Sequence, residues 1–261
     1  MDLILPCVWF FILGTALGSF YNVLADRLPE GRDFVFERSI CCDCGTKLRW
    51  YDLIPVFSFL FIGGKCRYCG AKLSAWYPVS EIVMGLLGVY AFLRYASFGS
   101  VSSLVGNMIF WSLLFIVAVM DWKTGMIMDV FPIIIAVSGI VFGLIDGRGI
   151  LDILLGGVVG GACFGLLYLA AKLILRREGL GLGDVFLLGG IGFWMPWQMA
   201  IITAFLTAYV SLVFILIKAL KEKKIGMKTE FPLGPSICIA AFIMNICGER
   251  ILGFITGIIL P

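Results

Sequence analysis

Long runs without a charged residue recur along this chain, and each is close to the roughly 20 residues that a helix needs to cross the hydrocarbon core of a membrane. With 61% hydrophobic and 14% charged residues, the chain lies outside the range of water-soluble domains, in which about a quarter of residues are charged. The spacing of these runs predicts single transmembrane helices over residues 3–25, 77–92, 101–120, 127–145 and 153–171.

A longer charge-free run covers residues 185–217. As one helix it would extend roughly 50 Å at 1.5 Å per residue, which is too long for a single crossing. Because Gly and Pro weaken helices, we predict a break within residues 192–197 and two spans from this run. Residues 231–260 supply the last span. The expected fold is an all-α polytopic membrane protein with about eight transmembrane helices.

The positions of lysine and arginine predict the orientation, because cytoplasmic loops are enriched in these residues. If the N-terminus lies outside, inside segments hold all but three of the 20 basic residues, the exceptions being Arg94, Arg148 and Arg250. We expect residues 1–25 to be a retained transmembrane helix, residues 26–76 a cytoplasmic loop domain, and residues 77–261 a seven-helix membrane domain. The net charge of +3 follows from this placement and does not indicate nucleic-acid binding.

Five of the nine cysteines lie in the loop domain, and four of them form two Cys-x-x-Cys pairs. Thiolates in this arrangement can surround Zn²⁺ as a tetrahedron, so we predict a structural zinc site at Cys41, Cys44, Cys66 and Cys69. Reduced or disulfide-linked cysteines without a metal are the alternative, and Cys42 could compete as a ligand. A small loop domain with few large apolar residues needs such a crosslink to fold.

The sequence contains no histidine. This excludes Ser-His and Cys-His nucleophilic pairs and the histidine-based zinc proteases. Any hydrolytic reaction must therefore depend on other groups, and carboxylates at the edges of membrane spans are the strongest candidates because they are costly to keep there. These carboxylates are Asp26, Glu81, Asp121, Asp129, Asp152 and Asp184. We interpret Asp152 as a solvated cap at the outer end of its span.

Asp184 ends a glycine-rich segment in which Gly181 and Gly183 allow the backbone to approach a bound chain closely. Such a segment can also be a simple turn. It becomes a candidate catalytic loop when a second aspartate lies on the same side of the membrane, and either Asp121 or Asp129 could be that partner. Two adjacent carboxylates share one proton, so one can accept a proton from water while the other protonates the scissile carbonyl.

The chain resembles the prepilin peptidase (type IV leader peptidase) family of GxGD-type intramembrane aspartic proteases along nearly its whole length. The residues that carry the resemblance are Gly18 to Val23, Arg27-Leu28-Pro29, the two cysteine pairs around Trp50-Tyr51-Asp52 and Ile54-Pro55-Val56, Gly64 to Cys69, Tyr77-Pro78 with Glu81, Asp121 with Asp129, Gly181-x-Gly183-Asp184, and Pro232-Leu233-Gly234-Pro235.

By this resemblance Asp121 and Asp184 are the catalytic pair, Gly181 and Gly183 form the active-site loop, and Asp129 is a conformational or supporting residue. The family cleaves a basic leader after a glycine from type IV prepilin or pseudopilin precursors, at the cytoplasmic face of the bacterial inner membrane. Many members also methylate the new N-terminus with S-adenosylmethionine, which makes Glu81 and Lys65 candidates for the methyltransferase region.

Three other interpretations fit parts of the sequence. A transporter or channel would use intramembrane carboxylates to relay protons or ions. A non-catalytic scaffold would use the cysteine loop to hold pilus or secretion components. A peptidase without methyltransferase activity would keep the aspartate pair alone.

Overall fold

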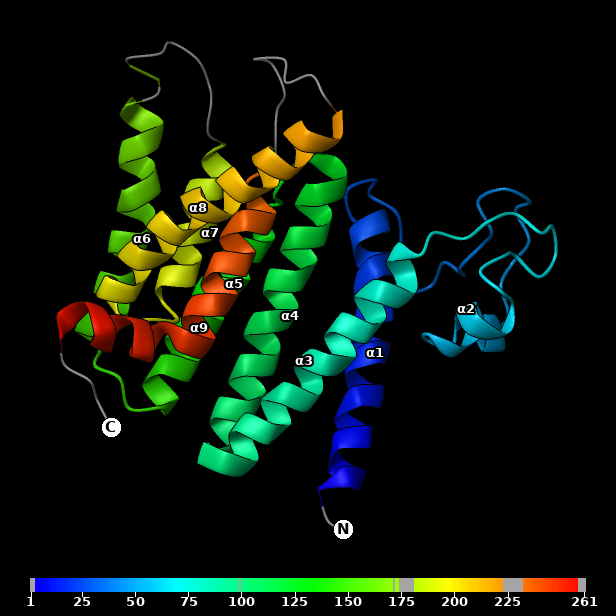
Figure 1. Cartoon of the computed structure of the whole chain (residues 1–261), viewed down its shortest axis with the longest axis horizontal. Coiled ribbons are helices and arrows are strands. Elements are labelled where there is room, and N and C mark those ends of the chain that lie inside the picture. The colour runs from blue at the N-terminus through cyan, green and yellow to red at the C-terminus, as the bar shows by residue number, and fades with distance from the viewer. Residues whose placement is uncertain (1–2, 99, 171, 174–180, 223–231, 258–261) are drawn as a thin grey trace. The chain divides into compact units, whose positions relative to one another are not determined.

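The computed structural model describes residues 3–98, 100–170, 172–173, 181–222 and 232–257 (Figure 1). It divides into two compact units, Met1–Met108 and Ile109–Pro261. The first unit contains α1 (Ile4–Arg27), the short 3₁₀ helix η1 (Trp50–Leu53), α2 (Phe57–Phe61) and α3 (Trp76–Phe98). Helix α4 (Val101–Thr124) begins in the first unit and ends in the second. The second unit continues with α5 (Val130–Ile145), α6 (Ile150–Ala170), α7 (Leu182–Gly192), α8 (Trp197–Glu222) and α9 (Gly234–Thr256).

The predicted all-α membrane architecture is confirmed. Within the described residues, six helices are long and apolar enough to cross a membrane: α1, α3, α4, α6, α8 and α9. Helices α5 and α7 are also apolar but shorter. The predicted break in the long apolar run is present, because α7 ends at Gly192 and α8 begins at Trp197. Each of the eight predicted spans therefore corresponds to a helix, and two of these helices are shorter than a full crossing.

Helices α1 and α3 pack closely in the first unit because glycine lies on both facing surfaces. A side chain at Gly14, Gly18, Gly85 or Gly88 would collide with the facing helix. Small residues at such positions bring two membrane helices close enough for van der Waals packing, which drives helix association in lipid. A buried hydrogen bond of 2.7 Å from Asn22 Nδ2 to Ser80 Oγ adds to this contact.

Helix α7 is held in the second unit by close packing and by polar contacts at its C-terminal end. It packs against α6 through a second set of glycines: Gly156, Gly160, Gly189 and Gly192. Arg148, in the turn between α5 and α6, donates a hydrogen bond of 3.1 Å to the carbonyl of Phe193. A cation at a helix C-terminus stabilises the exposed carbonyl groups there. These contacts fix the helix that carries Asp184.

The three-part division at residues 25 and 76 and the inside-outside orientation stay predictions. Several residues on which the orientation depends, namely Arg176, Arg177 and residues 223–228, lie outside the described residues, as do Gly179 and Leu180 at the start of the glycine-rich segment.

Candidate functional site

The two cysteine pairs adopt the same local fold. In the first, the N–H of Cys41 donates to Thr46 O and the N–H of Gly45 donates to Cys41 O. In the second, the N–H of Cys66 donates to Ala71 O and the N–H of Gly70 donates to Cys66 O. Gly45 and Gly70 have φ values of 67° and 75°, which favour glycine because a side chain is strained there. Each sequence thus closes into a tight knuckle that directs its two sulfur atoms to the same side.

The two knuckles bring together the sulfur atoms of Cys41, Cys44, Cys66 and Cys69, which all lie within 4.8 Å of one another. The Sγ atoms of Cys41 and Cys69 are 3.9 Å apart. Four sulfurs about 2.3 Å from a central Zn²⁺ would lie about 3.8 Å apart, so the donor set fits tetrahedral zinc. None of these cysteines forms a disulfide. Cys42 is exposed and is not a member of the cluster.

The thiols of the cluster influence one another's protonation. Hydrogen bonding with the side chain and the backbone of Thr46 lowers the pKa of Cys44 to about 6. The backbone N–H groups of Tyr68 and Cys69 lower the pKa of Cys66. The pKa of Cys69 is raised to about 12: the N–H of Ala71 acts in the opposite direction, but burial and the neighbouring sulfurs outweigh it. A cation bound between the four sulfur atoms would offset the electrostatic repulsion between their thiolates.

Two buried side chains attach the cysteine loop to the helices of its unit. Arg27, at the end of α1, donates hydrogen bonds to the carbonyls of Asp33 and Glu37 at 3.0 and 2.6 Å. Glu81, on α3, accepts a 2.7 Å hydrogen bond from the N–H of Val56. Both side chains are almost fully buried. The beginning and the middle of the loop are therefore each held by an ionisable side chain.

The backbone at Val56 is strained. Its φ and ψ are 61° and −52°, and the N–H of Phe57 donates to Pro55 O at 2.6 Å, which closes a γ-turn around it. This conformation is rare for any residue other than glycine and is unfavourable for a β-branched one. The hydrogen bond to Glu81 compensates part of that cost, and it is a contact that the sequence alone did not reveal.

Asp121 lies near the C-terminal end of α4 and is only 4% exposed. Its Oδ2 atom accepts a 2.8 Å hydrogen bond from the N–H of Gly234, the first residue of α9. Gly234 belongs to the Pro232-Leu233-Gly234-Pro235 segment, which carries part of the family resemblance, and the sequence alone does not predict this contact.

Asp184 lies in the first turn of α7 and is 8% exposed. Its Oδ2 atom accepts a 3.1 Å hydrogen bond from the N–H of Gly181, while its own N–H donates to Gly181 O. A side chain at Gly183 would meet Ile127 at 3.1 Å, so glycine allows close packing at this point. The glycine-rich segment thus fixes the carboxylate at the start of its helix.

The structure brings Asp121 and Asp184 together in buried positions, whereas Asp129 is exposed. The two buried carboxylates are close enough to interact electrostatically, and both also interact with the buried thiol of Cys238 on α9. Asp129 is exposed at the N-terminal end of α5. Of the two partners considered for Asp184, Asp121 is the one that interacts with it electrostatically.

The remaining candidates have different surroundings. Glu81 is buried on α3, whereas Lys65 is exposed beside Cys66. Asp26 accepts a 3.2 Å hydrogen bond from the hydroxyl of Tyr77. Asp152 is exposed in the first turn of α6, in agreement with its interpretation as a solvated cap.

A helical membrane protein with two interacting buried aspartates, and with no histidine in its sequence, has the architecture of an intramembrane aspartic protease. Residues 12–95 match the model of the bacterial peptidase A24 N-terminal domain, and residues 108–216 match that of the type IV leader peptidase family. The chain belongs to the type IV leader peptidase family.

Curated relatives support this membership. A protein of Klebsiella pneumoniae is 34% identical over 203 residues, covering 74% of this chain and 88% of the relative. A protein of Bacillus subtilis (strain 168) is 32% identical over 246 residues, covering 94% of this chain and 95% of the relative. A protein of Pseudomonas putida is 30% identical over 267 residues, covering 92% of this chain and 90% of the relative. All three are named prepilin leader peptidase/N-methyltransferase. No solved structure matches the chain.

Proposed function

We propose that this protein is a prepilin leader peptidase that removes the basic leader of type IV prepilin or pseudopilin precursors after a glycine, with Asp121 and Asp184 as the catalytic pair. The observation that carries the proposal is the meeting of these two buried carboxylates from α4 and α7, each fixed by a backbone N–H. Family membership and the names of the relatives support the substrate class.

In this mechanism the two carboxylates hold one proton between them. The ionised carboxylate accepts a proton from a water molecule, whose oxygen attacks the carbonyl carbon of the scissile peptide bond. The protonated carboxyl group donates its proton to the carbonyl oxygen. When the tetrahedral intermediate breaks down, the C–N bond is cleaved and the leaving amine takes up the proton that the first carboxylate accepted from water. Water is the nucleophile, so no covalent enzyme intermediate forms.

The proposed location of the reaction is the cytoplasmic face of the inner membrane, with both termini of the chain outside. The distribution of basic residues supports this orientation, because it places the cysteine loop and the ends of α4 and α7 that carry the aspartates on the inner side. The basic leader of the substrate stays on the same side by the same rule. A transporter or a scaffold would not require two aspartates to meet at one point.

We also propose that Cys41, Cys44, Cys66 and Cys69 bind a structural zinc ion. The sulfur positions support it, because all four sulfurs lie within 4.8 Å of one another and one pair is 3.9 Å apart, close to the spacing of a tetrahedral zinc site. The metal would connect the two knuckles and thereby stabilise the loop domain, whose exposed apolar residues between them include Trp50, Phe57 and Phe61. It would have no part in peptide cleavage.

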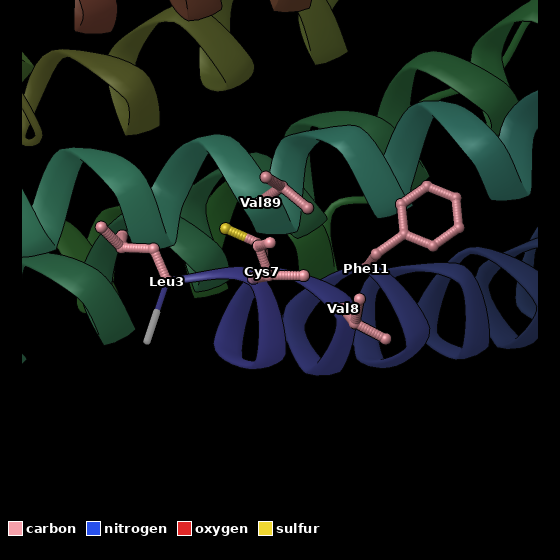
Figure 2. A pocket seen from close by; sticks show the side chains of 6 residues that line it. Leu3, Cys7, Val8, Phe11 and Val89 are labelled. Atoms are coloured by element: carbon pink, nitrogen blue, oxygen red, sulfur yellow. The ribbon is translucent and has the colours of Figure 1, made fainter. Parts of the chain in front are cut away.

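N-methylation of the new N-terminus is the second proposed activity, supported by the names of the relatives. S-adenosylmethionine would supply a methyl group from a sulfonium cation. The apolar cavity of about 350 Å³ between α1 and α3 does not suit this charged cofactor, since it is lined by Leu3, Ile4, Cys7, Val8, Phe11 and Val89 (Figure 2). The buried carboxylate of Glu81 fits better, as it could attract a cation or accept the proton of the amine. Lys65 remains the second candidate in this region.

The peptidase proposal is tested by cleavage of a model prepilin with the purified protein in liposomes. Asp121→Asn and Asp184→Asn keep the size of each side chain but remove its ability to exchange a proton, so each should abolish cleavage while the protein stays folded. The exposed Asp152→Asn variant is the matched control and should cleave at the wild-type rate. Wild-type cleavage by either active-site variant contradicts the proposal.

A further inference from the structure

The N-terminus of α9 makes a direct contact with the Asp121 carboxylate. The N–H of Gly234 donates to Asp121 Oδ2 at 2.8 Å, and the bond is buried although the two residues are 113 positions apart in the chain. Gly234 is the first residue of a helix that extends to Thr256. The contact therefore joins α4 to the start of a long helix at the site of the proposed reaction.

Position 234 has no space for a side chain. A Cβ atom built there would lie 2.6 Å from Asp121 Oδ2 and 2.9 Å from both its Cβ and Cγ atoms. These distances are well below the roughly 3.5 Å or more at which two non-bonded carbon atoms rest. Glycine is thus required for the close approach of the backbone to the carboxylate, because any other residue would displace Asp121 or the start of α9.

The contact also changes the electrostatic surroundings of Asp121. The carbonyl groups at the C-terminal end of α4 disfavour a negative charge, whereas the free N–H groups at the N-terminus of α9 favour one. The other titratable groups that act at this point are Asp184 on α7 and Cys238 on α9. Two negative charges at this point would repel each other, whereas the hydrogen bond from the Gly234 N–H stabilises a charge on Asp121.

We propose that Gly234 is a positioning residue for the peptidase reaction, a conclusion that rests on the proposed function of the Asp121 and Asp184 pair. Its N–H fixes Oδ2 of Asp121, which leaves the other carboxylate oxygen to share the proton with Asp184 and to accept a proton from water. The absence of a side chain at position 234 allows this arrangement.

Gly234→Ala tests the proposal through kinetics. The carboxylate moves, so kcat should fall about 10- to 100-fold, in line with the effect of a misplacement of about 1 Å, while KM stays near the wild-type value. The acidic limb of the pH–rate profile should move to higher pH, because a carboxylate that loses a hydrogen-bond donor is protonated more readily. The matched control is Gly248→Ala on the same helix, where a Cβ atom would meet the flexible side chain of Met199 instead. It should leave kcat and the pH profile unchanged.

A double-mutant cycle in thermal stability tests the contact itself without using activity. Gly234→Ala should lower Tm in the wild-type background and lower it by less in the Asp121→Ala background, where two of the three colliding atoms are gone. Gly248→Ala should change Tm by the same amount in the wild-type and Asp121→Ala backgrounds. An equal cost of Gly234→Ala in the two backgrounds, or an unchanged kcat and pH profile, overturns the proposal. If instead Asp121→Asn cleaves normally, the proposed function fails, and the cycle still reports whether the contact exists.

Discussion

The hydrogen bond from Val56 to Glu81 should control the local stability of the cysteine loop. Replacing Glu81 with alanine removes the acceptor of a partly buried N–H and releases the strained γ-turn at Val56. A hydrogen bond to a charged group contributes about 1.5–3 kcal/mol. Loss of this amount lowers the free energy of local opening and should accelerate amide hydrogen exchange about 10- to 150-fold, since 1.4 kcal/mol corresponds to a factor of ten.

The assay is hydrogen exchange with mass spectrometry on a peptide covering residues 54–64. Glu81→Gln is the matched control, because its amide oxygen still accepts the hydrogen bond from Val56, and it should change the exchange rate much less. The first cysteine knuckle has its own backbone hydrogen bonds and should exchange at the same rate in all three proteins. An unchanged rate over residues 54–64 in Glu81→Ala would refute the reasoning that this contact holds the turn.

Two further predictions concern the same unit. Cys66→Ser should reduce the zinc content measured by metal analysis and make the loop more sensitive to proteolysis, because one of four thiolate ligands is lost. The control Cys42→Ser should leave the zinc content and the protease sensitivity unchanged. A wild-type protein that contains no zinc would contradict this prediction. Glu81→Gln should retain cleavage but lose transfer of a labelled methyl group from S-adenosylmethionine to the cleaved precursor. The control is Glu249→Gln, at an exposed position, which should retain both activities. Normal methylation by Glu81→Gln would exclude Glu81 from that reaction.

The helices, the break between α7 and α8 and the cysteine cluster could be predicted from the sequence. The lengths of the charge-free runs located the helices, and the Gly and Pro residues near position 195 located the break between α7 and α8, because both features act locally. The spacing of the cysteines also predicted a cluster that the structure assembles, since a Cys-x-x-Cys-Gly knuckle directs both sulfurs to one side by its own backbone geometry.

Contacts between segments that are distant in the sequence could not be predicted from the sequence alone. Position along the chain left both Asp121 and Asp129 open as partners of Asp184, and only the family resemblance favoured Asp121, because the choice depends on how α4 ends and how α5 begins. The hydrogen bond from Gly234 to Asp121 and that from Val56 to Glu81 involve backbone N–H groups, which every residue except proline has. No residue type marks such a donor, so its role appears only when the chain is folded.

The central claim is that Asp121 and Asp184 act as one unit, and the most direct test is the rate of prepilin cleavage by the two single Asn variants and by the double variant. Residues that act together are strongly non-additive in their kinetic effects. The account predicts that each single variant falls to the background rate and that the double variant is no slower. Partial losses in the single variants that multiply in the double variant would contradict it, because the two carboxylates would then contribute independently.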